Sequence, residues 1–128
     1  MNIGEASAAS GVTAKMIRHY EDSGLIRPPR RTASNYRAYS DTDVHVLRFI
    51  KRARNLGFSV AEIRELLGLW QNKARSSAAV KRIARNHIDE LGRKIAELQS
   101  MVRTLEHLTH NCHGDHRPEC PILEELAR

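Results

Sequence analysis

The fold of the N-terminal half follows from residues 2–30, NIGEASAASGVTAKMIRHYEDSGLIRPPR. Apolar residues at helical spacing predict a first helix over residues 2–9, and Gly11 can supply the positive φ of a tight turn after it. A second helix is expected over residues 14–22, with Thr13 as its N-cap. Two short helices joined by a glycine turn, the second one basic, predict a helix-turn-helix.

The second helix has an apolar and a basic side. Met16, Ile17 and Tyr20 share one stripe, which is expected to face inward. The basic residues fall on the other side, where they are available to a polyanion such as DNA. The candidate DNA contacts on this helix are Lys15, Arg18, His19 and Tyr20.

The next segment, residues 25–39, is expected to form a wing beside the helices. Its prolines exclude a helix, and Leu25-Ile26 and Tyr36–Tyr39 could form two short strands around a basic tip. Arginine and tyrosine side chains suit contacts with the phosphate backbone. The candidate phosphate contacts are Arg31, Tyr36 and Arg37, with Arg54 at the end of the next helix.

Two capping patterns predict the remaining helices of a DNA-binding domain over residues 1–70. Ser40-x-x-Asp43 opens a third helix that Gly57 closes, and Ser59-x-x-Glu62 opens a fourth that carries Trp70 near its end. The following residues, 71–76, are interpreted as a linker.

A long helix is expected over residues 77–110. Apolar residues recur at alternating steps of three and four along it, which is the pattern of a heptad seam. Such a helix would be about 50 Å long and needs a partner to bury its seam, so it is interpreted as a dimerisation helix. The pattern of β-branched residues and leucines favours a parallel pair by the usual rule. The seam residues are Ile88, Leu91, Ile95, Leu98, Val102 and Leu105.

Residues 111–128 are expected to form a loop and a short tail helix, and the loop carries both cysteines. Cys112 and Cys120 could hold a monovalent cation such as Cu(I), Ag(I) or Au(I) between two soft thiolates. His113 and His116 could instead complete a four-ligand Zn(II) site. A thiol-disulfide switch, a structural disulfide and two incidental thiols are the other interpretations.

Composition narrows the class of protein. The 128 residues carry a net charge of +6, and residues 1–60 hold ten basic and five acidic residues. A basic half beside a nearly neutral half indicates a polyanion-binding domain attached to another module. Neither a membrane span nor a signal peptide is expected, and two cysteines indicate a reducing compartment, so the protein is expected in the cytoplasm. No catalytic motif is evident, and an enzyme is not expected.

The combination of several motifs resembles the MerR family of bacterial transcription regulators. These are Arg18-x-Tyr20-Glu21, Gly24-Leu25-Ile26, Tyr36-Arg37-x-Tyr39 and Gly57-Phe58-Ser59. Within the family, the Cys112-x7-Cys120-Pro121 loop is similar to that of the copper-efflux regulators, which sense Cu(I), Ag(I) and Au(I). Ser77 stands where the regulators of divalent metals typically carry a cysteine ligand, and it is expected beside the metal site.

The resemblance implies a mainly α protein: a winged helix-turn-helix head, a long dimerisation helix forming an antiparallel coiled coil, and a C-terminal metal-binding loop. It also implies a homodimer on an inverted repeat in double-stranded promoter DNA, with RNA polymerase on the same promoter. Metal binding would then reshape the promoter so that polymerase can use it. The family's antiparallel pairing is expected here in place of the parallel pairing that the seam rule favours.

Overall fold

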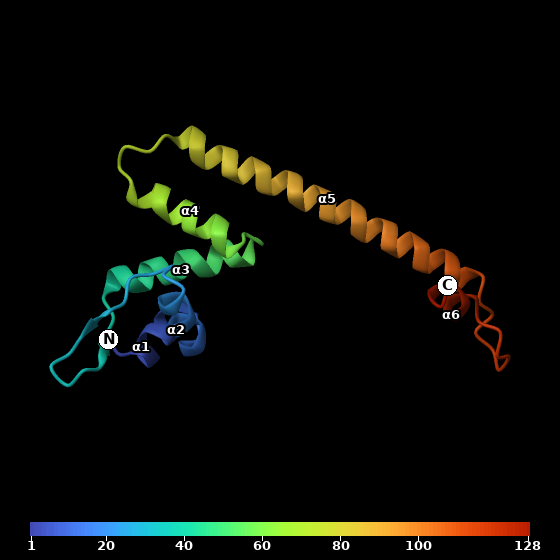
Figure 1. Ribbon diagram of the computed structural model, residues 1–128, viewed down its shortest axis with the longest axis horizontal. Coiled ribbons are helices and arrows are strands. Elements are labelled where there is room, and N and C mark those ends of the chain that lie inside the picture. Colours follow the sequence, from blue (N-terminus) through green and yellow to red (C-terminus); the bar gives the residue numbers. More distant parts are fainter. The chain divides into compact units, whose positions relative to one another are not determined.

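The computed structural model describes residues 1–128 and is mainly helical (Figure 1). It divides into two compact units, residues 1–83 and residues 84–128, with the boundary inside the longest helix. The elements in chain order are α1 Ile3–Ser10, α2 Ala14–Asp22, β1 Arg30–Arg31, β2 Arg37–Ala38, α3 Asp41–Asn55, α4 Val60–Gln71, α5 Ser77–His110 and α6 Pro121–Leu126.

The helix-turn-helix expected at the N-terminus is present as α1 and α2. Helix α1 begins one residue later than expected, because Asn2 acts as its N-cap and exchanges hydrogen bonds with Glu5 in a capping box. Gly11 ends α1 with φ 77°, and its N–H donates to the Ser7 carbonyl at 2.8 Å. Thr13 Oγ1 accepts from the Met16 N–H at 3.2 Å, which starts α2.

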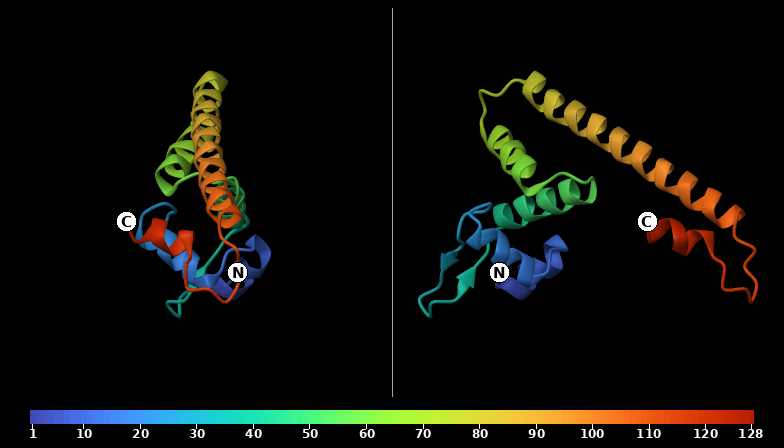
Figure 2. Two further views of the ribbon diagram at one scale, coloured as in Figure 1. Left: turned by 90° about the vertical axis from the view of Figure 1, so that its right-hand side faces the viewer. Right: turned by 45° about the vertical axis from the view of Figure 1, so that its right-hand side comes forward.

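The core of the first unit lies where α1 packs against α2 and α3 and where α3 packs against α4 (Figures 1 and 2). Hydrogen bonds reinforce these contacts: Arg48 Nε of α3 donates to the Ala9 carbonyl of α1 at 3.0 Å. Arg64 of α4 donates to the Ser23 carbonyl at the end of α2 at 3.2 Å. The largest fully buried side chains of this core are Ile17, Leu47, Ile50 and Ile63.

The wing is a two-stranded antiparallel hairpin, but its first strand is not where the sequence indicated. Arg30 pairs with Ala38 and Arg31 with Arg37. The expected strand at Leu25-Ile26 is wrong, because both backbone N–H groups donate to the Tyr20 carbonyl, at 3.0 and 3.3 Å. That segment therefore closes the end of α2, and the basic residues of the expected tip form β1 instead.

The third and fourth helices begin where the capping patterns predicted. Ser40 and Asp43 form a capping box at α3, and Ser59 and Glu62 form one at α4. Helix α4 extends through Gln71, so this residue belongs to the helix and not to the expected linker. The Trp70 ring stacks on that of Phe49, with centroids 4.7 Å apart.

The long helix α5 has the predicted bounds, and its seam is exposed in the single chain. Ile88, Ile95, Leu98, Val102 and Leu105 are each more than half exposed, and Leu91 is 37% exposed. After α5 the chain makes a loop, and α6 runs back toward the last turns of α5 (Figures 1 and 2). Leu108, on those last turns, is buried.

None of the helices is both long enough and apolar enough to cross a membrane.

Candidate DNA interface and metal site

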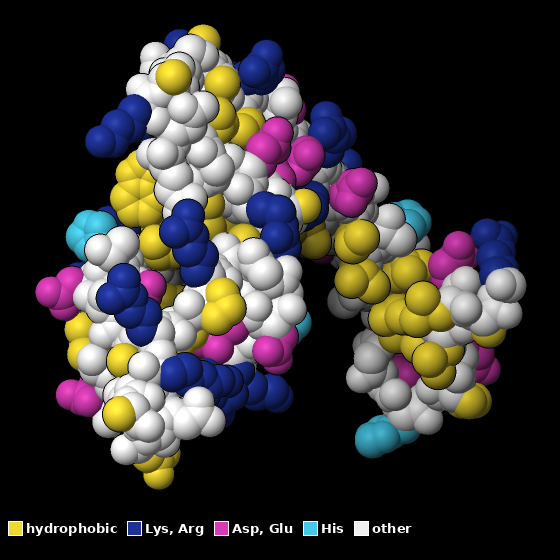
Figure 3. All heavy atoms as spheres, turned by 60° about the vertical axis from the view of Figure 1, so that its left-hand side comes forward, with side chains coloured by type: hydrophobic (Ala, Val, Ile, Leu, Met, Phe, Trp, Pro, Cys, Tyr) yellow, Lys and Arg dark blue, Asp and Glu magenta, His cyan; other side chains and the backbone are white.

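Helix α2 presents its basic side chains to solvent. Lys15, Arg18 and His19 are exposed, whereas Ile17 and Tyr20 are buried on the opposite side. Lys15 and Arg18 are three residues apart and therefore share a face of the helix. Figure 3 shows Lys and Arg side chains at several places on one face of this unit, with Asp and Glu side chains among them. The arrangement can place cations against a polyanion without disturbing the core.

Tyr20 differs from the other candidates on α2. Only 5% of its surface is exposed, because it packs in the core with Ile17. Little of its side chain is therefore available to DNA, and its backbone carbonyl accepts the two N–H groups that close α2. The sequence placed Tyr20 both on the inward stripe of α2 and among the candidate DNA contacts. The structure shows that packing in the core covers most of its surface.

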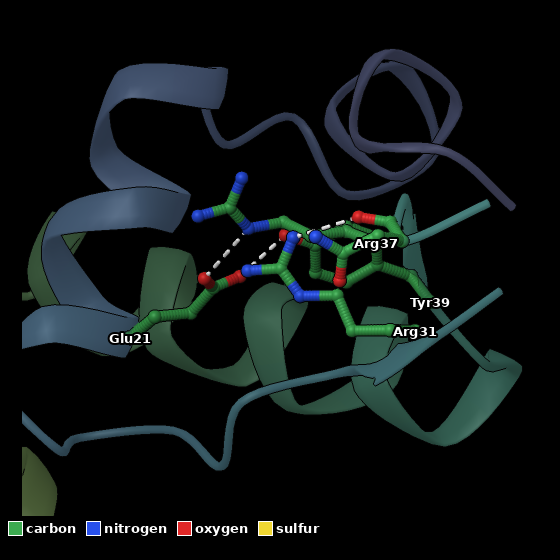
Figure 4. A network of polar contacts seen from close by, with 5 residues as sticks. Glu21, Arg31, Arg37 and Tyr39 are labelled. Atoms are coloured by element: carbon green, nitrogen blue, oxygen red, sulfur yellow. Dashed lines mark hydrogen bonds and ion pairs between the residues drawn. The ribbon is translucent and has the colours of Figure 1, made fainter. Parts of the chain in front are cut away.

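The wing is joined to α2 through the carboxylate of Glu21 (Figure 4). Arg37 Nε donates to Glu21 Oε2 at 3.1 Å, and the Tyr39 hydroxyl donates to Glu21 Oε1. The Glu21 side chain is only 7% exposed and that of Arg37 28%. Burial first, and then the hydrogen bond to Glu21, raise the pKa of Tyr39 well above its usual value, so the hydroxyl remains a donor.

The other candidate phosphate contacts are exposed. Tyr36 lies in the turn of the hairpin with 71% of its surface exposed. Arg31 Nη1 donates to the Asn35 carbonyl at 3.1 Å, which holds its side chain over the hairpin (Figure 4). Arg54 Nη1 donates to the Phe58 carbonyl at 2.9 Å, in the turn between α3 and α4. Each arginine keeps further N–H groups for a phosphate.

Sequence reasoning did not single out Glu21 and Tyr39 as interface residues. Both belong to motifs of the family resemblance, yet neither is a cation that would contact phosphate. One signal was present: Glu21 and Asp22 are the only acidic residues between Lys15 and Arg37, within an otherwise basic segment. A carboxylate in such a place indicates an internal partner for an arginine.

The two cysteines lie together in the loop after α5. Their Sγ atoms are 4.0 Å apart, and both side chains are half-buried free thiols. A disulfide would require about 2.05 Å. Two sulfurs on one ion with bonds of about 2.3 Å are separated by about 3.8 Å in a tetrahedral site and about 4.6 Å in a linear one. The thiol pair can therefore take one soft metal ion with a small adjustment.

Backbone donors favour the ionised form of Cys120. The residue precedes α6, and the N–H of Leu123 is the main cause that lowers the pKa of its thiol. The neighbouring Cys112 thiol and the N–H of Ile122 lower it further, against the opposing effect of desolvation. Because the thiolate is the metal-binding and nucleophilic form, this environment favours metal binding and thiol chemistry alike.

The other candidate ligands do not join the thiols. His113 and His116 are exposed. No histidine or carboxylate forms, with either cysteine, a group of three ligand atoms that all lie within 4.8 Å of one another. Ser77 is exposed at the first turn of α5, in the first unit, while the cysteines lie in the second.

A helix-turn-helix with a basic outer face, joined to a two-stranded wing through Glu21, is the architecture of a DNA-binding regulator. Family models place the chain more narrowly: "MerR HTH family regulatory protein" matches residues 1–69, and "MerR, DNA binding" matches residues 44–108. The chain belongs to the MerR family. It is a DNA-binding transcription regulator and not an enzyme.

Several relatives match this chain along its length. An HTH-type transcriptional regulator HmrR of Sinorhizobium medicae is 63% identical over 100% of this chain and 87% of the relative. Heavy metal-dependent transcription regulator 2 of Rhizobium meliloti is 62% identical over 99% and 86%. The HTH-type transcriptional regulator CueR of Escherichia coli is 40% identical over 99% and 94%.

Two solved structures are similar over nearly the whole chain. A transcription regulator of Ralstonia metallidurans in complex with lead(II) has a TM-score of 0.86 and 32% identity, covering 98% of each chain. A MerR regulator of Bacillus megaterium in complex with mercury(II) has a TM-score of 0.76 and 34% identity, covering 100% of each chain. The long helix after the DNA-binding head is therefore part of a shared fold.

Proposed function

We propose that the chain is a metal-responsive transcription activator that binds Cu(I) through Cys112 and Cys120 and switches on copper- and silver-resistance genes. The observation that carries the proposal is the pair of free thiols 4.0 Å apart, to which neither neighbouring imidazole belongs. Two thiolates suffice for Cu(I), Ag(I) or Au(I), which accept soft sulfur ligands. A relative at 62% identity is named a heavy metal-dependent regulator, which supports a metal response.

Charge supports selectivity for a monovalent ion. Two thiolates with Cu(I) carry a net charge of −1, whereas two thiolates with a divalent ion are neutral. Backbone N–H groups that already favour the Cys120 thiolate, those of Leu123 and Ile122, would stabilise the anionic complex. Ser77 supplies a hydroxyl and no third thiolate, which agrees with a site of two sulfurs.

The basic surface of the first unit supplies the DNA contacts. Arg18, with Lys15 and His19 beside it, would enter the major groove, where arginine recognises guanine edges. Arg31, Tyr36, Arg37 and Arg54 would hold the phosphate backbone. Replacing Arg31 and Arg37 by alanine together should reduce affinity for all DNA and flatten its salt dependence, by about 0.9 in the log–log slope for each lost phosphate contact.

Dimerisation would use the exposed seam of α5. Six apolar side chains that are 37–59% exposed would be buried when two copies pair. We adopt the antiparallel arrangement, which would set the separation of two heads on an inverted repeat. Metal binding would then change the shape of the bound promoter so that RNA polymerase can use its two elements, a form of control through DNA deformation.

Two other functions have an observation in their favour. A divalent-metal sensor is favoured by the structural likeness to regulators that were solved with lead(II) and mercury(II). In that case His113, His116 or groups of a second copy would add ligands. A thiol redox switch is favoured by two free thiols in sulfur–sulfur contact, which an oxidant could join with a small movement of the loop.

The deciding experiment combines ligand identification with transcription. Protein loaded anaerobically with Cu(I) should show two sulfur neighbours and no nitrogen by X-ray absorption. In vitro transcription should respond to Cu(I) in a competing chelator and not to Zn(II). A zinc response with nitrogen ligands would replace the proposal with the divalent sensor, and a metal-free response to oxidant would replace it with the redox switch.

A further inference from the structure

Glu21 is an acidic residue that lies between helix α2 and the wing, the two parts of the head that carry the proposed DNA contacts. It lies in the last turn of α2, and its carboxylate points toward the wing (Figure 4). The side chain is only 7% exposed, which is unusual for a carboxylate on a basic surface. Such burial is costly unless the charge is paired and hydrogen-bonded. Glu21 meets that condition with partners from the wing alone.

Both partners of the Glu21 carboxylate come from β2 or the residue after it: Arg37 lies in β2, and Tyr39 directly follows it. Arg37 Nε donates to one carboxylate oxygen at 3.1 Å, and the Tyr39 hydroxyl donates to the other. The contact with Glu21 uses only Nε of Arg37, so the N–H groups on its two terminal nitrogens remain for another partner. Two such N–H groups of an arginine can bind a phosphate in a bidentate manner. The carboxylate thus contacts two side chains of the wing, one of which is an arginine with further donors.

We propose that Glu21 is a positioning residue for DNA binding: its carboxylate holds the wing against α2 and aims the terminal amino groups of Arg37 at the phosphate backbone. Two backbone hydrogen bonds between Tyr39 and Met1, at 2.7 and 2.9 Å, anchor the end of β2, and the Glu21 contacts add the link from β2 to α2. An ordered Arg37 loses less side-chain freedom when DNA binds, which strengthens binding. The inference rests on the proposed phosphate contact of Arg37.

Removing the charge of Glu21 should change DNA affinity in opposite directions under a positioning role and under simple electrostatics. Removing a negative charge from a basic head should by itself strengthen binding to a polyanion. The positioning role of Glu21 has the opposite consequence, because Arg37 would become disordered. Glu65 is an exposed carboxylate on α4, so Glu65→Gln is a matched control that removes the same charge elsewhere on the same unit.

The experiment measures operator affinity of the full-length chain as a function of salt for Glu21→Gln, Glu65→Gln, Arg37→Ala and the double variant Glu21→Gln/Arg37→Ala. Glu21→Gln should weaken binding about tenfold and lower the log–log salt slope by about 0.9 per head. Glu65→Gln should leave binding unchanged or slightly stronger. The double variant should bind like Arg37→Ala alone, since Glu21 acts through Arg37.

Each outcome has a distinct meaning. If Arg37→Ala itself leaves affinity and slope unchanged, the proposed wing contact is wrong. If Arg37→Ala weakens binding but Glu21→Gln does not, the positioning role is overturned and the wing contact stands. Additive losses in the double variant would also overturn it. Thermal unfolding of each variant is measured in parallel, and Glu21→Asp, which keeps the charge, should restore part of the salt slope if the variant is folded.

Discussion

Cys112 Sγ lies 4.0 Å from Cys120 Sγ, although eight positions separate the two residues in the chain. The approach is local: Cys112 follows the last turn of α5, and Cys120 directly precedes α6. The loop between them brings the sulfurs close without joining them. The spacing of the two cysteines in the sequence therefore corresponds to a formed thiol pair.

Replacing either Cys112 or Cys120 by serine should abolish transcription triggered by Cu(I). A hydroxyl is a hard and poorly ionised ligand, and one thiolate cannot hold the ion alone. Operator binding should stay within about twofold of the original, an effect of less than roughly 0.5 kcal/mol, because the proposed DNA contacts lie in the other unit. Transcription assays and DNA titrations of the same preparations test both parts, and a retained Cu(I) response would contradict the ligand assignment.

Replacing His113 and His116 together by alanine should leave the response to Cu(I) unchanged. Both rings are exposed, and neither belongs to a group of ligand atoms with the thiols. The measurement is the Cu(I) concentration at half-maximal transcription, set with a competing chelator. Loss of the response in this variant would favour the divalent site, in which imidazole is a ligand.

Leu98→Asp should break the dimer. Leu98 is 59% exposed in the single chain and occupies the middle of the seam, where pairing would bury two opposed carboxylates. We expect the dissociation constant to rise at least about hundredfold, roughly 3 kcal/mol. Sedimentation equilibrium measures it, and Ser100→Asp, on the side of α5 away from the seam, is the matched control. An intact Leu98→Asp dimer would refute the seam assignment.

Arg18→Ala should lower affinity for the operator more than affinity for random DNA. An arginine that reads a base edge contributes about 1–3 kcal/mol of discrimination, whereas a phosphate contact affects all sequences alike. Competition titrations with operator and random duplexes give the ratio. Equal losses on the two DNAs would make Arg18 a phosphate contact only.

Gly11→Ala should destabilise the first unit by about 1–2 kcal/mol, because an L-residue is strained at positive φ. Gly11 has φ +77°, and an added Cβ would also lie 2.4 Å from Lys51 Nζ. Gly68→Ala is the control: it lies inside α4 with nothing within 4 Å of the added carbon. That change should stabilise the helix by about 0.5–1 kcal/mol. Chemical denaturation monitored by circular dichroism compares the two, and equal effects would contradict the strain at Gly11.

Local chemistry in the sequence determined most of the helices. Thr13, Ser40 and Ser59 start helices where they were expected, because an N-cap satisfies backbone N–H groups within three residues of itself. The length of α5 agrees with a heptad pattern in a segment that has no proline. The proximity of the two thiols was also within reach of the sequence, since a short loop connects them.

Tertiary structure decided the wing and the residues that hold it. Leu25 and Ile26 have the composition of a strand, but the Tyr20 carbonyl accepts both of their N–H groups, a helix-ending pattern that Gly24 allows with φ 76°. The contact between Glu21 and Arg37 joins residues 16 positions apart, and it exists only because α2 and the hairpin pack on one core. Capping joins residues that are neighbours in the chain, so the sequence alone can predict it. The partner of a buried charge such as Glu21 depends on which elements the fold brings together.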